Sequence, residues 1–128
     1  MNDSKNPLSP HLQIYRWHIS SLLSITHRIS AVINLLALIL ILFWLIVLSF
    51  GEGSYESFLL SINSFYGKFI LIGFTWSMIF HLLSGIRHLV WDLGHGFEIK
   101  TANISGTIVI IFSLAMTIIF WLFARGFI

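Results

Sequence analysis

The sequence predicts an all-α membrane protein with three transmembrane helices, preceded by a short interfacial segment at the N-terminus. Of its 128 residues, 57% are hydrophobic and only 9% are charged, which is unlike the composition of a soluble domain. Three apolar stretches are long enough to cross a hydrocarbon core of about 30 Å, which takes about 20 helical residues. Three segments are too few to close a barrel, so these stretches must be helices that satisfy their own backbone polar groups.

We predict a single membrane-anchor domain over residues 1–128. Residues 1–28 form the interfacial segment, and the spans lie near 29–50, 69–90 and 104–124. We expect no cleavable signal peptide, because residues 1–28 carry two prolines and several polar groups and the first apolar run is too long. In the first span, Asn34 is expected to tie helices together. Three short helices enclose little volume, so we expect some of their faces to meet other chains as well as membrane lipid.

The positive charges predict the orientation. Five lysines and arginines precede the first span or lie at the end of the second span and just after it: Lys5, Arg16, Arg28, Arg87 and Lys100. Only Lys68 and Arg125 lie on the opposite side. This bias places the N-terminus on the cytoplasmic side of a bacterial inner membrane, or on the matrix side of a mitochondrial inner membrane.

The chain has no cysteine, which limits the redox chemistry that it can host. Thiolate-held iron–sulfur clusters, thioether-attached haem and disulfides are all excluded on this chain. Any redox cofactor must therefore be held non-covalently. We expect no nucleic-acid partner.

A histidine near the middle of the second span, His81, is the leading candidate for a functional residue. Ionisable side chains are costly at membrane depth and are often functional there. On a helical wheel, His81 belongs to one narrow stripe with small residues and a second histidine: Gly73, Ser77, Ser84, Gly85 and His88. Small neighbours leave room for a large flat group, and neutral imidazole is a common axial ligand of haem iron. We therefore predict a haem bound at His81.

The polar groups nearer the N-terminal side of the membrane fit the same hypothesis. His27, Arg28, Arg87 and His88 are expected at similar depth, where they could bind the carboxylates of a haem that is ligated at His81. Ser24 lies one turn before Arg28, and the two could donate hydrogen bonds to the carbonyl oxygens of a quinone.

A six-coordinate haem needs two axial ligands on opposite faces, and this chain offers only one histidine at midplane depth. His88 lies on the same face of the helix, about 10.5 Å along its axis. The other ligand is therefore expected from a second small membrane subunit.

Simpler interpretations stay open at this stage. Arg28 and Arg87 could be topology anchors with no ligand, and His81 could be a packing residue in a haem-free structural anchor. A proton-conducting subunit, with His81, His88 and Asp92 as a relay, is a further alternative. Against a relay, the other half of the second span contains no ionisable side chain.

Two motifs resemble a known family. Residues 9–15 (SPHLQIY) and 24–30 (SITHRIS) are similar to the N-terminal signature of the cytochrome b556 membrane-anchor subunits of succinate dehydrogenase. Residues 81–88 (HLLSGIRH), followed by Trp91 and Asp92, are similar to the second signature. Both occur in the family's order. One departure is Ala31, where the family usually has glycine.

The resemblance implies an anchor of respiratory complex II that binds haem b and ubiquinone. It implies that His81 is an axial haem ligand, that Ser24 and Arg28 line the quinone site, and that His27 and Arg28 lie near the haem propionates. His88 is implied as a further residue near the propionates. Succinate would be oxidised on a flavoprotein subunit, and electrons would reach quinone through an iron–sulfur subunit docked on the inner face.

Overall fold

The computed structural model describes residues 16–124, and this part of the chain contains helices and no strand. The helices are α1 (Ile19–Ser49), α2 (Glu52–Asn63), α3 (Phe65–Asp92) and α4 (Ile99–Ala124). Of these, α1, α3 and α4 are long and apolar enough to cross a membrane. The predicted all-α fold with three spanning helices is therefore confirmed. The motif at residues 9–15 and the first part of the predicted interfacial segment lie outside the described residues.

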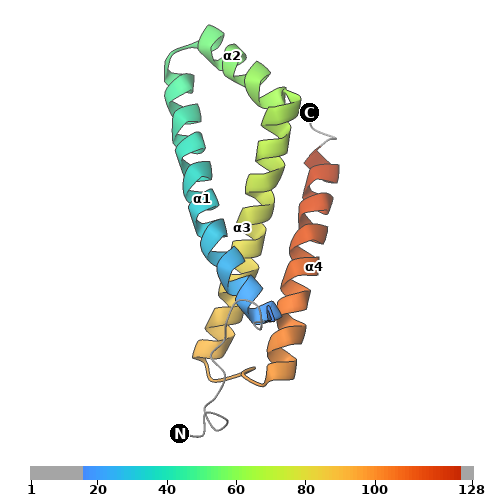
Figure 1. Ribbon diagram of the computed structural model, residues 1–128. Coiled ribbons are helices and arrows are strands. Elements are labelled where there is room, and N and C mark those ends of the chain that lie inside the picture. Colours follow the sequence, from blue (N-terminus) through green and yellow to red (C-terminus); the bar gives the residue numbers. More distant parts are fainter. Residues whose placement is uncertain (1–15, 125–128) are drawn as a thin grey trace, which may run out of the picture.

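The three long helices run in alternating directions, and α2 crosses one end of the molecule between α1 and α3 (Figure 1). We call this end the α2 end. The opposite end, where residues 93–98 join α3 to α4, is called the loop end. The helices α1 and α3 lie side by side toward the loop end and separate toward the α2 end (Figure 1). This crossing places the polar residues of the first half of α1 against the second half of α3.

The helices extend beyond the predicted spans. The first helix begins at Ile19 instead of near residue 29, the second spanning helix covers 65–92 instead of 69–90, and the third begins at Ile99 instead of near 104. An apolar run marks only the part of a helix that can lie in lipid. The backbone hydrogen bonds of the helix continue through the polar residues on either side, so the helix is longer than the run. At the start of α3 the helix is capped by Ser64, whose Oγ accepts a hydrogen bond from the Gly67 N–H at 3.1 Å.

The helix α2 was not among the predicted elements. It follows Gly51, whose φ of 95° is a conformation that favours glycine. One face of α2 is half-buried, and the ring of Phe58 contacts that of Phe43 on α1 at 6.0 Å between centroids. The half-buried residues recur at the i, i+3, i+4, i+7 spacing of an amphipathic helix: Tyr55, Phe58, Leu59 and Ile62. The spacing of these apolar residues in the sequence could have predicted helix α2.

The three long helices meet through a small apolar core and a larger set of small polar residues. Leu23, Phe80 and Val109 form the core, one from each long helix. The other buried residues of these helices are mostly hydroxyl-bearing: Ser30, Ser77, Ser84, Ser113 and Thr117. Small residues let helix backbones approach closely in a membrane, where lipid competes with apolar contacts between helices. Most large apolar side chains face outward, toward lipid or other chains.

Gly67 provides a test of the junction between α2 and α3. A Cβ at this position would overlap backbone atoms of Ser61 and Ile62, which cannot move as the end of a side chain can. We expect Gly67→Ala to destabilise the protein by about 1–3 kcal/mol through overpacking, and to lower the thermal denaturation midpoint in detergent. Gly73→Ala is the matched control in the same helix, because no atom lies within 4 Å of its Cβ position. Equal midpoints for the two variants would contradict the close contact.

Candidate functional site

Three histidine rings form a column between α1 and α3. His27 on α1 lies between His81 and His88, which are two turns apart on α3. The ring centroids of His27 and His81 are 4.2 Å apart, and those of His27 and His88 are 5.1 Å apart. We call these three residues the histidine column. The structure thus brings together three of the five site residues that the resemblance implies. All three side chains are half-buried.

Two of the ring nitrogens in the column have hydrogen-bond partners. Nδ1 of His81 lies 2.9 Å from the Oγ of Ser30 on α1. Nδ1 of His88 lies 2.7 Å from the carbonyl oxygen of Ser84, one turn earlier in α3. Within residues 16–124, Nε2 of His81 has no hydrogen bond, and Nε2 of His27 is buried without a partner. The column therefore keeps nitrogen atoms available for a group that this chain does not supply.

The contact between α1 and α3 beside His81 is fixed by a buried hydroxyl. Ser77, one turn before His81, has its Oγ 3.1 Å from the carbonyl oxygen of Ser30 and 2.9 Å from Oδ1 of Asn34. The hydroxyl therefore donates toward α1. This contact confirms that Asn34 ties two helices together. Because Ser30 also contacts His81, the same contact positions the histidine relative to α1.

The geometry of the column indicates which kind of group it could hold. The His27 ring is inclined by 35° to that of His81 and by 23° to that of His88, and rings packed in this way do not direct their in-plane lone pairs to a common point. No set of metal-ligating side chains able to hold a lone ion occurs in residues 16–124. Gly85, one turn after His81, has no atom within 4 Å of its Cβ position, so the surface there is open. The buried Oγ of Ser84 has no partner within the described residues. A free imidazole nitrogen, an open surface and unpaired polar atoms fit a haem with polar edges.

The other two predicted site residues, Ser24 and Arg28, lie one turn apart on the exposed side of α1. Neither makes a hydrogen bond to another residue in the range 16–124. A nearby cavity of about 310 Å³ at the loop end is lined by Ser20, Trp91 and residues of the loop and α4, but not by Ser24 or Arg28. The described residues therefore leave these two side chains open to another molecule, without enclosing a pocket around them.

Arg87 was expected at a depth similar to that of His27 and His88, where it could bind haem carboxylates or act as a topology anchor. Its side chain points away from these histidines. Its side chain is buried and turns toward α4, where Nε donates to Ser105 Oγ at 3.0 Å and Nη2 donates to the carbonyl oxygen of Ala102 at 2.8 Å. Its guanidinium also lies 4.0 Å from the centroid of the Trp91 ring. Because helix α4 provides acceptors that the sequence could not locate, Arg87 joins α3 to α4 and does not face the histidine column.

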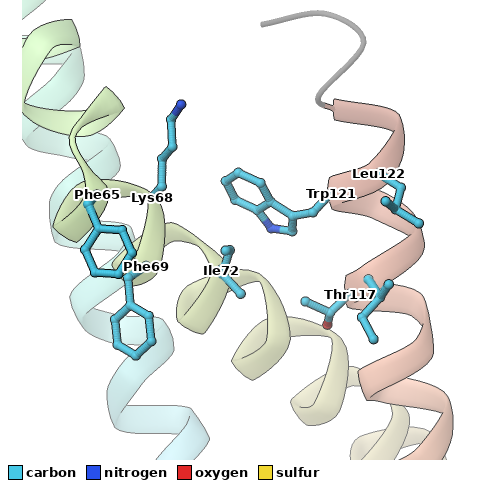
Figure 2. Close-up of a pocket in the computed structure, with 8 residues that line it drawn as sticks. Phe65, Lys68, Phe69, Ile72, Thr117, Trp121 and Leu122 are labelled. Atoms are coloured by element: carbon cyan, nitrogen blue, oxygen red, sulfur yellow. The ribbon is translucent and has the colours of Figure 1, made fainter.

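A larger groove, of about 580 Å³, lies between α3 and α4 near the α2 end. Figure 2 shows Trp121 extending from α4 toward α3, with Lys68 at the rim. The Trp121 Nε1–H donates to Thr75 Oγ1 at 3.3 Å. The remaining lining is almost entirely apolar and contains no histidine. This groove is therefore separate from the histidine column.

Comparison with known proteins agrees with the geometry. Residues 2–120 match the family model for the succinate dehydrogenase/fumarate reductase transmembrane subunit. The chain is 42% identical over 118 residues to the succinate dehydrogenase cytochrome b556 subunit of Rickettsia felis, with 92% of each chain covered. It is 35% identical over 119 residues to that of Paracoccus denitrificans, covering 93% of this chain and 92% of the relative. It is also 37% identical over 124 residues to the mitochondrial cytochrome b560 subunit of Mus musculus, covering 87% of this chain and 67% of the relative.

These matches extend over nearly the whole chain, including all three spanning helices and the histidine column. The chain is a multi-pass membrane protein and belongs to the succinate dehydrogenase/fumarate reductase transmembrane subunit family.

Proposed function

We propose that this chain is the haem b- and ubiquinone-binding membrane anchor of a succinate:quinone oxidoreductase, and that it passes electrons from an iron–sulfur subunit to quinone. Succinate oxidation takes place on a separate flavoprotein subunit. The observation that carries the proposal is His81, a half-buried imidazole in the middle of a spanning helix. Its Nδ1 contacts Ser30, and its Nε2 meets no hydrogen-bond partner in residues 16–124.

Each member of the histidine column has a role in this proposal. Haem b, when bound, supplies a one-electron redox centre. His81 would hold the haem iron through Nε2. His27 and His88 lie on the loop-end side of His81, and together with the exposed side chain of Arg28 they would hold the propionate carboxylates. Charge-assisted hydrogen bonds to carboxylates are about twice as strong as neutral ones, which favours propionates at this end of the column.

A second small membrane-anchor subunit would supply the other residue that holds the haem. Neither His27 nor His88 would supply it, because the His27 ring lies directly against the His81 ring and the His88 ring lies beyond that of His27. The outward-facing apolar surfaces of α1 and α3 give a partner helix room to approach.

The quinone contacts Ser24 and Arg28. A hydroxyl and a guanidinium one turn apart offer several donors to a quinone carbonyl oxygen, and both side chains are exposed. Since the described residues do not enclose a pocket there, the remaining walls come from the partner anchor and the iron–sulfur subunit.

The loop end faces the cytoplasm or the mitochondrial matrix, by the distribution of lysine and arginine. The iron–sulfur subunit docks at this end, near Ser24, Arg28 and His88. An inner membrane is the proposed location, in agreement with bacterial relatives and a mouse relative whose name places it in mitochondria.

A proton relay through the column has less support. The three rings are close enough to form one, but it would end at His81. Between Phe69 and His81, helix α3 contains no ionisable side chain, so no path continues toward the α2 end.

The haem assignment is tested with His81→Ala. We expect loss or a marked shift of the low-spin b-type absorbance of the assembled complex, because an axial nitrogen is removed, while the three helices still insert. The measurement is a reduced-minus-oxidised spectrum normalised to the amount of complex. His95→Ala, in the exposed loop between α3 and α4, is the matched control. Wild-type haem content and spectrum in His81→Ala would refute the assignment and favour a haem-free structural anchor.

The quinone site is tested with Ser24→Ala. Loss of the hydroxyl leaves a ligand oxygen without its donor, at a cost of about 1–3 kcal/mol, so succinate-to-quinone activity should fall. Reduction of a dye that takes electrons upstream of the anchor should stay at the wild-type level. Ser49→Ala is the control, because Ser49 is exposed near the α2 end of the same helix. Equal effects on both activities, or none, would count against a quinone contact.

The role of Arg28 is tested by Arg28→Lys, which keeps the charge. Guanidinium presents five donors in a fixed fork, whereas ammonium is a compact point charge, so lysine should not replace it at a shared site. We expect lower quinone reductase activity and a shifted haem potential, with an unchanged membrane orientation. Arg16→Lys serves as the control on the same side of the membrane. Wild-type turnover together with an unshifted potential would show that Arg28 is only a topology anchor.

A further inference from the structure

Ser30 makes two hydrogen bonds at the contact between α1 and α3. Its Oγ lies 2.7 Å from the carbonyl oxygen of His27, in the preceding turn of α1. The same Oγ lies 2.9 Å from Nδ1 of His81 on α3. The residue is only 1% exposed, so water does not compete for these contacts.

The first of these bonds fixes the direction of the second. A serine hydroxyl carries one proton, and a carbonyl oxygen can only accept, so the proton of Ser30 points to His27 O. Toward His81 the hydroxyl can then offer only a lone pair, so Nδ1 of His81 must carry the hydrogen. In a neutral imidazole only one ring nitrogen is protonated, which leaves Nε2 with a free lone pair.

The contact between α3 and α4 contains the same arrangement with an unambiguous donor. Ser113 is fully buried and its Oγ donates to the carbonyl oxygen of Ile110 at 2.9 Å. It also accepts from Nε1 of Trp76 at 3.2 Å. An indole N–H can only donate, so this serine accepts from a ring on α3 while it donates to its own helix. Ser30 and His81 repeat this pattern on the other side of α3.

We propose that Ser30 is the positioning residue of the axial haem ligand: it accepts the Nδ1–H of His81, and so holds the ring in the tautomer whose Nε2 can bind iron. This inference rests on the proposed haem site. The hydrogen bond orients the ring and raises the basicity of Nε2. A more basic ligand stabilises ferric iron, so Ser30 lowers the reduction potential of the haem.

The position of Ser30 is itself fixed from α3. The Ser77 hydroxyl, one turn before His81, lies 3.1 Å from the backbone carbonyl oxygen of Ser30. Helix α3 therefore contacts Ser30 twice: Ser77 contacts the backbone carbonyl of Ser30, and His81 contacts its side-chain hydroxyl. This double contact leaves the serine little freedom to turn away from His81, which a positioning role requires.

The test is a redox titration of the haem in the assembled complex. Ser30→Ala removes the acceptor without adding volume, and we expect the midpoint potential to move upward and the low-spin ferric resonance signal to change. Haem affinity should fall about 10- to 100-fold, as is typical when the hydrogen-bond partner of a metal ligand is lost. Ser30→Thr keeps the hydroxyl and should restore the wild-type potential. Potential is read only from haem-loaded molecules, so a lower yield of either variant does not affect it.

Ser113→Ala is the matched control, because it removes the same kind of hydroxyl from the other helix contact and should leave the potential unchanged. A wild-type potential in Ser30→Ala would overturn the inference. So would equal shifts in Ser30→Ala and Ser30→Thr, or in Ser30→Ala and Ser113→Ala, because each would indicate a packing effect. Loss of haem in His81→Ala with no shift in Ser30→Ala would refute this inference alone, whereas retained haem in His81→Ala would refute the proposed haem site.

Discussion

A polar group in an apolar membrane protein must find its hydrogen-bond partner inside the molecule, and the contact between α1 and α3 depends on this requirement. The Ser77 Oγ lies within hydrogen-bond distance of the Ser30 carbonyl oxygen and of Asn34 Oδ1, and Ser30 contacts His81. Lipid is as apolar as leucine, so apolar surface alone does not favour one helix register over another. The buried hydroxyls supply the preference. Because they set how α1 crosses α3, they also place His27 between the two histidines of α3.

The molecule separates its polar and apolar features along its length. Toward the loop end, the histidine column, Ser24 and Arg28 form one polar region, whereas the groove near the α2 end is almost entirely apolar. Helix α4 contributes nothing to the column. It accepts the hydrogen bonds of Arg87 and Trp76 and thereby holds α3 from the side away from α1. The proposed redox chemistry is therefore assigned to α1 and α3, and α4 acts as their support.

Much of the outer surface of the described helices is apolar, and the side chains proposed to contact quinone are exposed. A site of this kind is incomplete on one chain. The chain belongs to a family of transmembrane subunits, and the proposal assigns the missing parts of the site to neighbouring subunits. The exposure of Ser24 and Arg28 agrees with that proposal.

The sequence alone determined the membrane class, the three spanning helices and the histidine at mid-span, because these follow from composition, the length of apolar runs and residue spacing within a helix. It also carried both motifs of the family. Tertiary structure decided which neighbour each polar side chain meets. Spacing fixes the angle of a residue about its own helix axis, but it does not fix how that helix is rotated and crossed against the others. For this reason the contact of Arg87 with α4 and the pairing of Ser30 with His81 became visible only once the helices were packed together.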